Sequence, residues 1–196
     1  MEIKDTVILL GDSPFIKTVE GQLPYVLDRY TSVGINRIVN TYKTSYQIFV
    51  DERMIPNANA HLDIPVISLR RYGDMIKVPE KELYDSYAFT TFKGDNIEKK
   101  DLLKDEKLAW CGFTHDFALS YLITKGWKNI VLLGAADMNM GSGHYSVNMA
   151  FTPSHKLIQR SKKFIEEVCA ERADIFTCNP DSILNVPKIS IEELLV

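Results

Sequence analysis

Short, continuous runs of apolar residues recur along the chain and are separated by polar loops. A run without alternation is typical of a strand that is buried on both faces, as in a parallel sheet. Pro65 indicates that one of these runs either lies at a sheet edge or begins a strand. The runs that predict strands are 6–10, 32–39, 46–50, 64–68, 127–134 and 174–177.

Between these runs, apolar residues recur at helical spacing. Gly126 is expected to end one helix, because glycine adopts the left-handed conformation that often follows a helix. The ranges that predict helices are 17–28, 110–126, 155–170 and 189–196, the first of them interrupted by Gly21 and Pro24. Strands alternating with helices predict an α/β fold in three layers, with a mainly parallel sheet and helices on both faces.

Residues 70–107 depart from this alternation. They are polar, rich in lysine and aspartate, and carry scattered aromatic residues. We expect a polar excursion from the sheet with short helical pieces, and both part of a lid and a plain surface insertion fit its composition. At 196 residues, a single domain over residues 1–196 is the expectation.

The net charge of the chain bears on which kinds of molecule it is expected to bind. The net charge is −3, whereas a binder of nucleic-acid polymers normally carries a basic surplus. A single bound nucleotide is compatible with this balance, because it needs only backbone donors and one or two cations.

The cysteines and the N-terminal residues indicate the cellular compartment in which we expect the protein. Cys111, Cys169 and Cys178 are an odd number without the spacing of a zinc site, which predicts free thiols in a reducing compartment. The first residues lack the pattern of a signal peptide, and no run is long enough for a transmembrane segment. We therefore expect a cytoplasmic protein.

Short polar residues and glycines follow several of the predicted strands. In an open parallel sheet, ligands bind beyond the carboxyl ends of the strands. Such neutral donors suit a ribose, a base and a phosphate, although each segment could instead be a simple turn or helix cap. The candidate nucleotide-binding residues are Gly11, Asp12, Ser13, Asn36, Asp51, Gly134, Asp137, Asn179 and Ser182.

His155 is the candidate general base. It opens the helix predicted at 155–170, where the positive end of the helix dipole favours the neutral imidazole that a base requires. An exposed histidine beside a helix cap is the alternative. The chain lacks the dinucleotide and Walker glycine motifs, the serine-hydrolase elbow and the paired histidines of a metalloprotease.

The order of these motifs resembles a known pattern. It is similar to that of the bacterial sialyltransferases of glycosyltransferase family 42, which use CMP-sialic acid, and of the proteins of domain-of-unknown-function family 115, which share a Rossmann-like plan. The matching stretches are Gly11-Asp12-Ser13-Pro14, Gly34-Ile35-Asn36, residues 126–134, His155 and residues 178–184.

The resemblance implies a site and a reaction. It implies a glycosyltransferase that moves a sugar from a nucleotide-sugar donor to an acceptor hydroxyl on a small molecule or glycan, with no cofactor required. His155 would be the general base, and Tyr145 would assist the leaving phosphate. The residues that the resemblance places at the donor are Asp12, Ser13, Asn36, Asp51 and Thr114.

Two other functions stay open. One is a diphosphotransferase acting on a small metabolite, which would need magnesium held by Asp12, Asp51 or Asp137. The other is a nucleotide-binding module without catalysis, since fold alone does not decide function. A homo-oligomer is compatible with each of the three.

Overall fold

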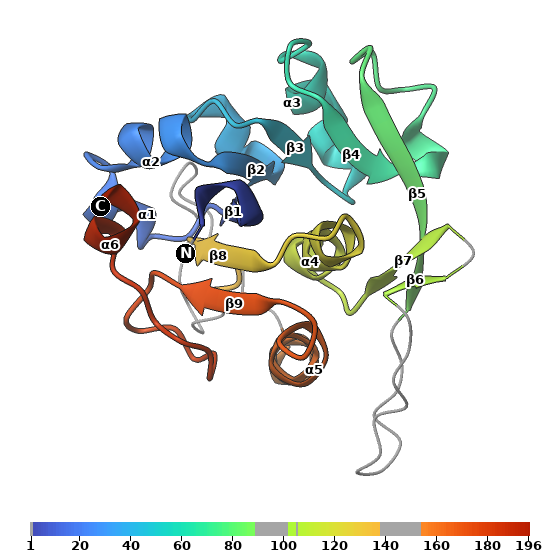
Figure 1. The fold of residues 1–196 in the computed structure, drawn as a ribbon. Helices are drawn as coiled ribbons and strands as arrows, with labels where there is room; N and C mark the ends of the chain where they lie inside the picture. Colours follow the sequence, from blue (N-terminus) through green and yellow to red (C-terminus); the bar gives the residue numbers. More distant parts are fainter. Residues whose placement is uncertain (1, 89–101, 105, 138–153) are drawn as a thin grey trace.

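The computed structural model describes residues 2–88, 102–104, 106–137 and 154–196. Its centre is a nine-stranded sheet with the strand order β6-β7-β5-β4-β3-β2-β1-β8-β9 (Figure 1). All pairings are parallel except that of β6 with β7. The strands are β1 Thr6–Leu10, β2 Thr31–Ile35, β3 Tyr46–Ile48, β4 Val66–Leu69, β5 Lys81–Ala88, β6 Leu103–Lys104, β7 Lys107–Trp110, β8 Asn129–Leu133 and β9 Asp174–Thr177.

Helices cover both faces of the sheet, which confirms the three-layer α/β prediction. Val7 and Leu9 of β1 pack in one core with α4 and α5, whereas Ile8 and Leu10 pack in a second core with α1, α2 and α6. The helices are α1 Ile16–Val19, α2 Leu23–Arg29, α3 Ile55–Asn59, α4 Thr114–Thr124, α5 His155–Phe164, which continues as a π-turn at Ile165–Cys169, and α6 Ile191–Leu195, with 3-10 turns at Ile3–Asp5, Asn36–Asn40, Glu52–Met54 and Arg70–Tyr72.

The polar segment 70–107 differs from its prediction. Among its described residues, short helical structure is found only in the 3-10 turn at Arg70–Tyr72, whereas Lys81–Ala88 and Lys107–Trp110 are strands that extend the sheet. The prediction for residues 89–101 and 105 lies outside the described residues. Most residues of β5 are only half-buried or exposed. A half-covered strand near a sheet edge accepts polar side chains, so its sequence lacks the apolar run that marks a central strand.

Two predicted strand limits also differ from the structure. The run at 32–39 is a strand only as far as Ile35, because Asn36 takes a positive φ of 55° and begins a 3-10 turn. Pro65 directly precedes β4, which pairs with β3 on one side and β5 on the other. The proline therefore marks the start of a strand and not a sheet edge.

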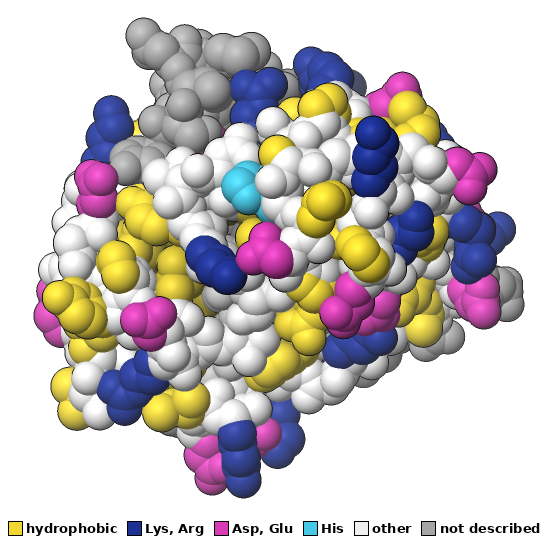
Figure 2. Space-filling model, turned by 90° about the horizontal axis from the view of Figure 1, so that it is seen from above, with side chains coloured by type: hydrophobic (Ala, Val, Ile, Leu, Met, Phe, Trp, Pro, Cys, Tyr) yellow, Lys and Arg dark blue, Asp and Glu magenta, His cyan; other side chains and the backbone are white. Residues whose placement is uncertain are grey.

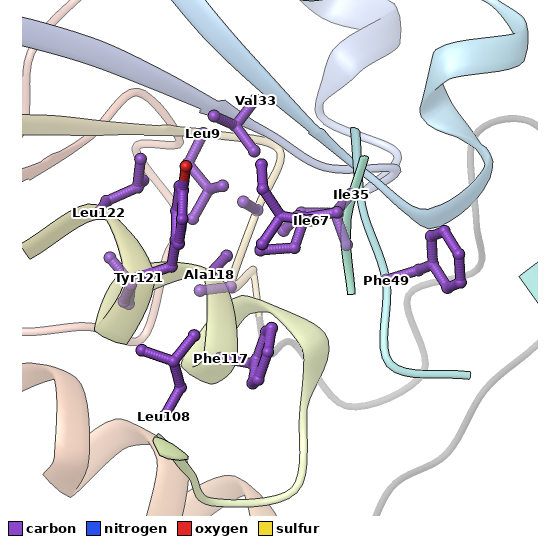
Figure 3. Packing of buried hydrophobic residues seen from close by; sticks show 14 of the residues in the cluster. Leu9, Val33, Ile35, Phe49, Ile67, Leu108, Phe117, Ala118, Tyr121 and Leu122 are labelled. Atoms are coloured by element: carbon purple, nitrogen blue, oxygen red, sulfur yellow. The ribbon is translucent and has the colours of Figure 1, made fainter. Parts of the chain in front are cut away.

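Helix α4 lies inside the curl of the sheet (Figure 1). Every residue from Asp116 to Leu122 is buried. Figure 3 shows Leu9, Val33 and Ile67 of the sheet on one side of this helix and Leu108 of β7 on another. Because strands approach it from several directions, α4 is apolar around most of its circumference, and its N-terminus at Thr114 is fixed relative to β2 and β7.

A buried polar cluster joins α4 to α5. Ser161 of α5 donates a hydrogen bond to Oδ1 of Asp116, and Nε2 of His115 lies 3.0 Å from the same Ser161 Oγ. Oδ2 of Asp116 accepts a hydrogen bond from the backbone N–H of Phe113 at 3.0 Å. Burial raises the pKa of Asp116 to about 7 and lowers the pKa of His115 to about 3. Both side chains are therefore mostly neutral near pH 6.5, and His115 packs against α5 as expected for a structural histidine.

The loops after β1 and β8 are in direct backbone contact. The N–H of Gly11 donates to the carbonyl of Leu133 at 3.0 Å, and the N–H of Ser13 donates to the carbonyl of Gly134 at 3.2 Å. A Cβ on Gly11 would lie 2.3 Å from the Gly134 oxygen. Gly134 itself has a φ of 67° and would place a Cβ 2.5 Å from Ile16. Neither position accepts a side chain without displacing backbone or core.

We expect Gly11→Ala to lower the free energy of unfolding by about 2–3 kcal/mol or more, because the methyl group meets backbone that cannot move aside. Gly21→Ala is the control, since a Cβ there meets no atom within 4 Å, and it should change stability by less than about 0.5 kcal/mol. Urea unfolding of both variants measures this. Equal stability of the two variants would contradict the close contact.

The buried Asp116 predicts a pH dependence of stability. Its folded pKa of about 7 lies above the ordinary value of 3.8, so the stability contributed by the protonated form is lost as pH rises through 7. His115 has the opposite sign, because its lowered pKa of about 3 costs stability as pH falls through its ordinary value of 6.5. Between pH 6.5 and 8 the titration of Asp116 removes about 0.8 kcal/mol of stability, and the last part of the titration of His115 in the unfolded chain returns about 0.4 kcal/mol, so we expect a net loss of about 0.4 kcal/mol from this pair.

Asp116→Asn should abolish this loss and be more stable than the unaltered chain at pH 8, because the amide is neutral, its oxygen can still accept from the N–H of Phe113, and its NH2 can donate to Oγ of Ser161. Exposed Asp74→Asn is the matched control and should leave the pH dependence unchanged. Chemical denaturation at pH 6.5, 7.2 and 8 tests it. An undiminished loss in Asp116→Asn would refute the assignment.

Candidate functional site

The sheet reverses its strand order between β1 and β8, since the chain leads from β1 to β2 on one side and from β8 to β9 on the other. At such a switch point the two loops diverge and leave room for a ligand at the carboxyl ends of the strands. The candidate residues Gly11, Asp12 and Ser13 lie on the loop after β1, and Gly134 and Asp137 lie on the loop after β8.

The structure brings three of the predicted residues together there. Oγ of Ser13 donates to Oδ2 of Asp137 at 2.5 Å, and a hydrogen bond also joins Asp137 to Asn179, which follows β9. Loops from three strands thus meet on one carboxylate. Asp12, between Gly11 and Ser13, is half-buried in the same loop.

Burial dominates the electrostatics of Asp137. Burial raises its pKa above the usual value, and the hydrogen bonds from Ser13 and Asn179 oppose this shift only in part. Its Oδ1 is buried and accepts no hydrogen bond from the part of the chain that the structure describes. A buried carboxylate oxygen without a donor is costly, so Oδ1 is suited to accept a hydrogen bond from a ligand hydroxyl.

Asn179 and Ser182 have local roles as well. Oδ1 of Asn179 accepts from the N–H of Asp181 at 3.0 Å, and Oγ of Ser182 accepts from the N–H of Leu184 at 3.3 Å. Both side chains therefore stabilise the turn after β9, which agrees with the alternative that this segment is a simple turn. Asn179 also reaches Asp137, whereas the contacts of Ser182 stay within its own turn.

A second pair forms beside the switch point. Oγ1 of Thr114, the first residue of α4, donates to Oδ1 of Asn36 at 3.4 Å. Asn36 and Ala136 both have positive φ angles, of 55° and 57°. Non-glycine residues rarely adopt this conformation, and such residues cluster at functional sites. Here one follows β2 and the other follows β8, both at the carboxyl edge.

The structure engages Asp51 in a different contact. Nε of Arg53 lies 3.0 Å from both carboxylate oxygens of Asp51. These hydrogen bonds hold the pKa of Asp51 below its usual value, and Arg37 adds to the shift. Asp51 is thus an ion-paired cap of the turn after β3. Arg37 and Arg53 were not predicted as site residues, and the signal for each in the sequence was a cation one position after Asn36 or two positions after Asp51.

His155 begins α5 and is exposed. Oγ of Ser154 caps this helix by accepting from the N–H of Leu157 at 3.3 Å. Leu157 packs so tightly on Gly112 that a Cβ there would lie 2.3 Å from its Cδ1. Because Gly112 leads into α4, the first turn of α5 lies against the loop that precedes Thr114. Tyr145 lies outside the described residues.

Three further observations concern the described residues and the surface of the molecule. No three His, Cys, Asp or Glu side chains of the described ranges come together as a bound metal ion requires. None of the described helices has the length and apolar character needed to cross a bilayer. On the face seen in Figure 2, basic, acidic and apolar side chains are intermixed, without one extended basic surface.

The chain was compared with protein families, curated protein sequences and solved structures. No protein-family model and no curated protein sequence matches the chain. The fold is similar to a solved structure of the MAf glycosyltransferase from Magnetospirillum magneticum AMB-1, with a TM-score of 0.64 and 12% identity over 98% of this chain. The chain spans 34% of the length of that protein. At this identity the likeness concerns the fold, and the chain thus has a fold that a known glycosyltransferase contains.

Proposed function

We propose that the chain is a glycosyltransferase that moves a sugar from a nucleotide-sugar donor to an acceptor hydroxyl. The observation that carries the proposal is the buried Oδ1 of Asp137, which has no hydrogen-bond donor among the described residues and lies where the loops after β1, β8 and β9 meet. A ribose or sugar hydroxyl is a neutral donor that satisfies this oxygen without bringing a like charge to it.

The position and the fold support the proposal. The carboxylate lies at the switch point of a parallel sheet, which is the usual ligand site of such folds. Asn36 and Thr114 lie after the neighbouring strand β2 and at the start of α4, and offer an amide and a hydroxyl to the same ligand. The structural similarity to the MAf glycosyltransferase agrees with this class of reaction.

In the proposed reaction His155 is the general base. It takes the proton of the acceptor hydroxyl, whose oxygen forms a new bond to the anomeric carbon of the donor sugar. The bond from that carbon to the phosphate oxygen breaks, and the nucleotide leaves with the electron pair. Tyr145 would stabilise the leaving phosphate. CMP-sialic acid or a similar CMP-sugar is the donor that we favour, and the step uses no metal.

The alternative of a magnesium-dependent diphosphotransferase would require Asp51 to change its contacts. Asp51 would have to leave Arg53 before it could bind a metal ion. Metal-dependent nucleotide binding therefore separates a diphosphotransferase from a CMP-sugar-dependent enzyme. A nucleotide-binding module without catalysis would bind nucleotide and fail to transfer the sugar.

We expect CMP to raise the thermal stability of the chain without magnesium, and UDP, GDP and ATP to do so less. A ligand at one hundred times its dissociation constant stabilises a fold by about 2.7 kcal/mol, which a thermal-shift measurement detects. A shift with ATP that appears only with magnesium would favour the diphosphotransferase. The absence of any nucleotide shift would overturn the proposed donor site.

Asn36→Gly should weaken nucleotide binding about tenfold, because it removes one half-buried hydrogen-bonding amide. Glycine is the appropriate replacement, since it adopts the positive φ of this position without strain. Asn185→Gly, at an exposed position after β9, is the control for the loss of an asparagine. Equal affinities of the two variants, measured by calorimetry, would show that Asn36 does not contact the nucleotide.

His155→Ala should reduce the rate of sugar transfer by about 100-fold or more, because general-base catalysis contributes at least that much. Nucleotide affinity should stay unchanged, since His155 acts on the acceptor. His61→Ala is the control, because His61 bonds to Asn40 in a loop away from the sheet's carboxyl edge. An undiminished rate in His155→Ala would exclude this histidine as the base.

A further inference from the structure

A recess lies at the carboxyl end of β4, where β5 continues past the end of its neighbour. Its volume is about 260 Å³, and it is lined by Leu69, Arg71, Asp85, Ser86 and Lys107. Leu69 is the last residue of β4, and Asp85 pairs in register with Lys107 of β7. Four of the five lining residues therefore belong to the strands β4, β5 and β7, and Arg71 belongs to the 3-10 turn that follows β4.

The recess has an excess of positive charge. Its lining holds two cations, Arg71 and Lys107, and one carboxylate, Asp85. Asp85 already has a cationic partner outside the lining, because Nε of Arg70 lies 3.7 Å from its Oδ2, while Nη2 of Arg70 lies 2.7 Å from Oε2 of Glu106. Within the described ranges, neither Arg71 nor Lys107 forms an ion pair. Two cations thus line a small recess in which the one carboxylate, Asp85, already has an ion-pair partner.

Arg71 is held in a fixed orientation. Its Nη2 donates to the hydroxyl of Tyr72 at 2.7 Å, and its guanidinium carbon lies 4.8 Å from the centre of the Tyr72 ring. Tyr72 is buried, and its hydroxyl donates to the carbonyl of Val50 at 3.3 Å. A guanidinium that is already ordered loses less conformational entropy when it binds an anion.

The recess is separate from the donor site but lies on the same edge of the sheet. β4 is three strands away from β1, which is about 14 Å along the sheet at the usual strand spacing. Ser13 and Asp137 mark the donor end of this edge, and Arg71 and Lys107 mark the other end. A two-substrate transferase needs a second subsite that can be occupied while the donor is bound.

We propose that this recess binds the anionic group, a carboxylate or a phosphate, of an acidic sugar that serves as acceptor. The inference rests on the proposed function, because it assigns the recess to the second substrate of that reaction. Arg71 and Lys107 bind the anion. A neutral sugar gains neither ion pair and binds more weakly.

The test is a titration of isotope-labelled protein with glucuronate, glucose 6-phosphate and glucose, followed through the amide signals of Leu69, Arg71 and Ser86. We expect both acidic sugars to shift these signals and glucose to leave them unchanged. Lys107→Gln should weaken the binding of the acidic sugars about fivefold, as expected for one exposed ion pair. Lys104→Gln, which removes the same charge from the exposed residue paired with Lys107 across β6 and β7, should not.

The outcomes separate the two proposals. A response to glucuronate alone or to glucose 6-phosphate alone supports the subsite and identifies its anion as a carboxylate or a phosphate. Equal binding of glucose, or equal weakening by Lys104→Gln, overturns it. CMP added in a parallel titration should shift Gly11 and Ser13. If CMP shifts these two signals and no acidic sugar shifts the signals of Leu69, Arg71 and Ser86, the proposed donor site is supported and the proposed acceptor subsite is wrong.

Discussion

The backbone contact between the loops after β1 and β8 is the constraint on which the candidate site depends. A Cβ on Gly11 would meet the backbone of Gly134, a Cβ on Gly134 would meet the side chain of Ile16, and the N–H of Ser13 donates to the Gly134 carbonyl. This contact fixes where the two loops diverge, and so places Ser13 against Asp137. The chemistry proposed for Asp137 follows from backbone packing and needs no long or flexible side chain.

The second constraint is the enclosure of α4 by the curled sheet. Because strands surround this helix, its first turn has a fixed position, and Thr114 meets Asn36 at the end of β2. Asp116 and Ser161 then join α5 to α4 through a buried polar contact. The helix that carries His155 is thus held both by this contact and by Leu157 against Gly112. Burying neutral polar groups costs little when each is hydrogen-bonded.

Elements with a continuous apolar pattern were predictable from the sequence. The strand at 174–177 and the helix that ends before Gly126 agree closely with β9 and α4, because a fully buried element must be apolar along its length. The strand β5 was missed because its residues are half-covered and accept lysine, glutamate and aspartate. The extra length assigned to β2 has a local cause, since the positive φ of Asn36 ends a strand that its apolar neighbours would have continued.

The sequence by itself determined the α/β class, the parallel sheet and the set of polar residues at the carboxyl ends of its strands. A strand that is buried on both faces is a continuous apolar run in the sequence, and the short loop that follows such a run contains the polar residues at its carboxyl end. Only the tertiary structure decided which of those residues act together. Ser13 and Asp137 are 124 positions apart and 2.5 Å from each other, whereas Asp51 is engaged by a neighbour two positions away. Strand order and backbone approach set these contacts, and neither is encoded in the periodicity of any single segment.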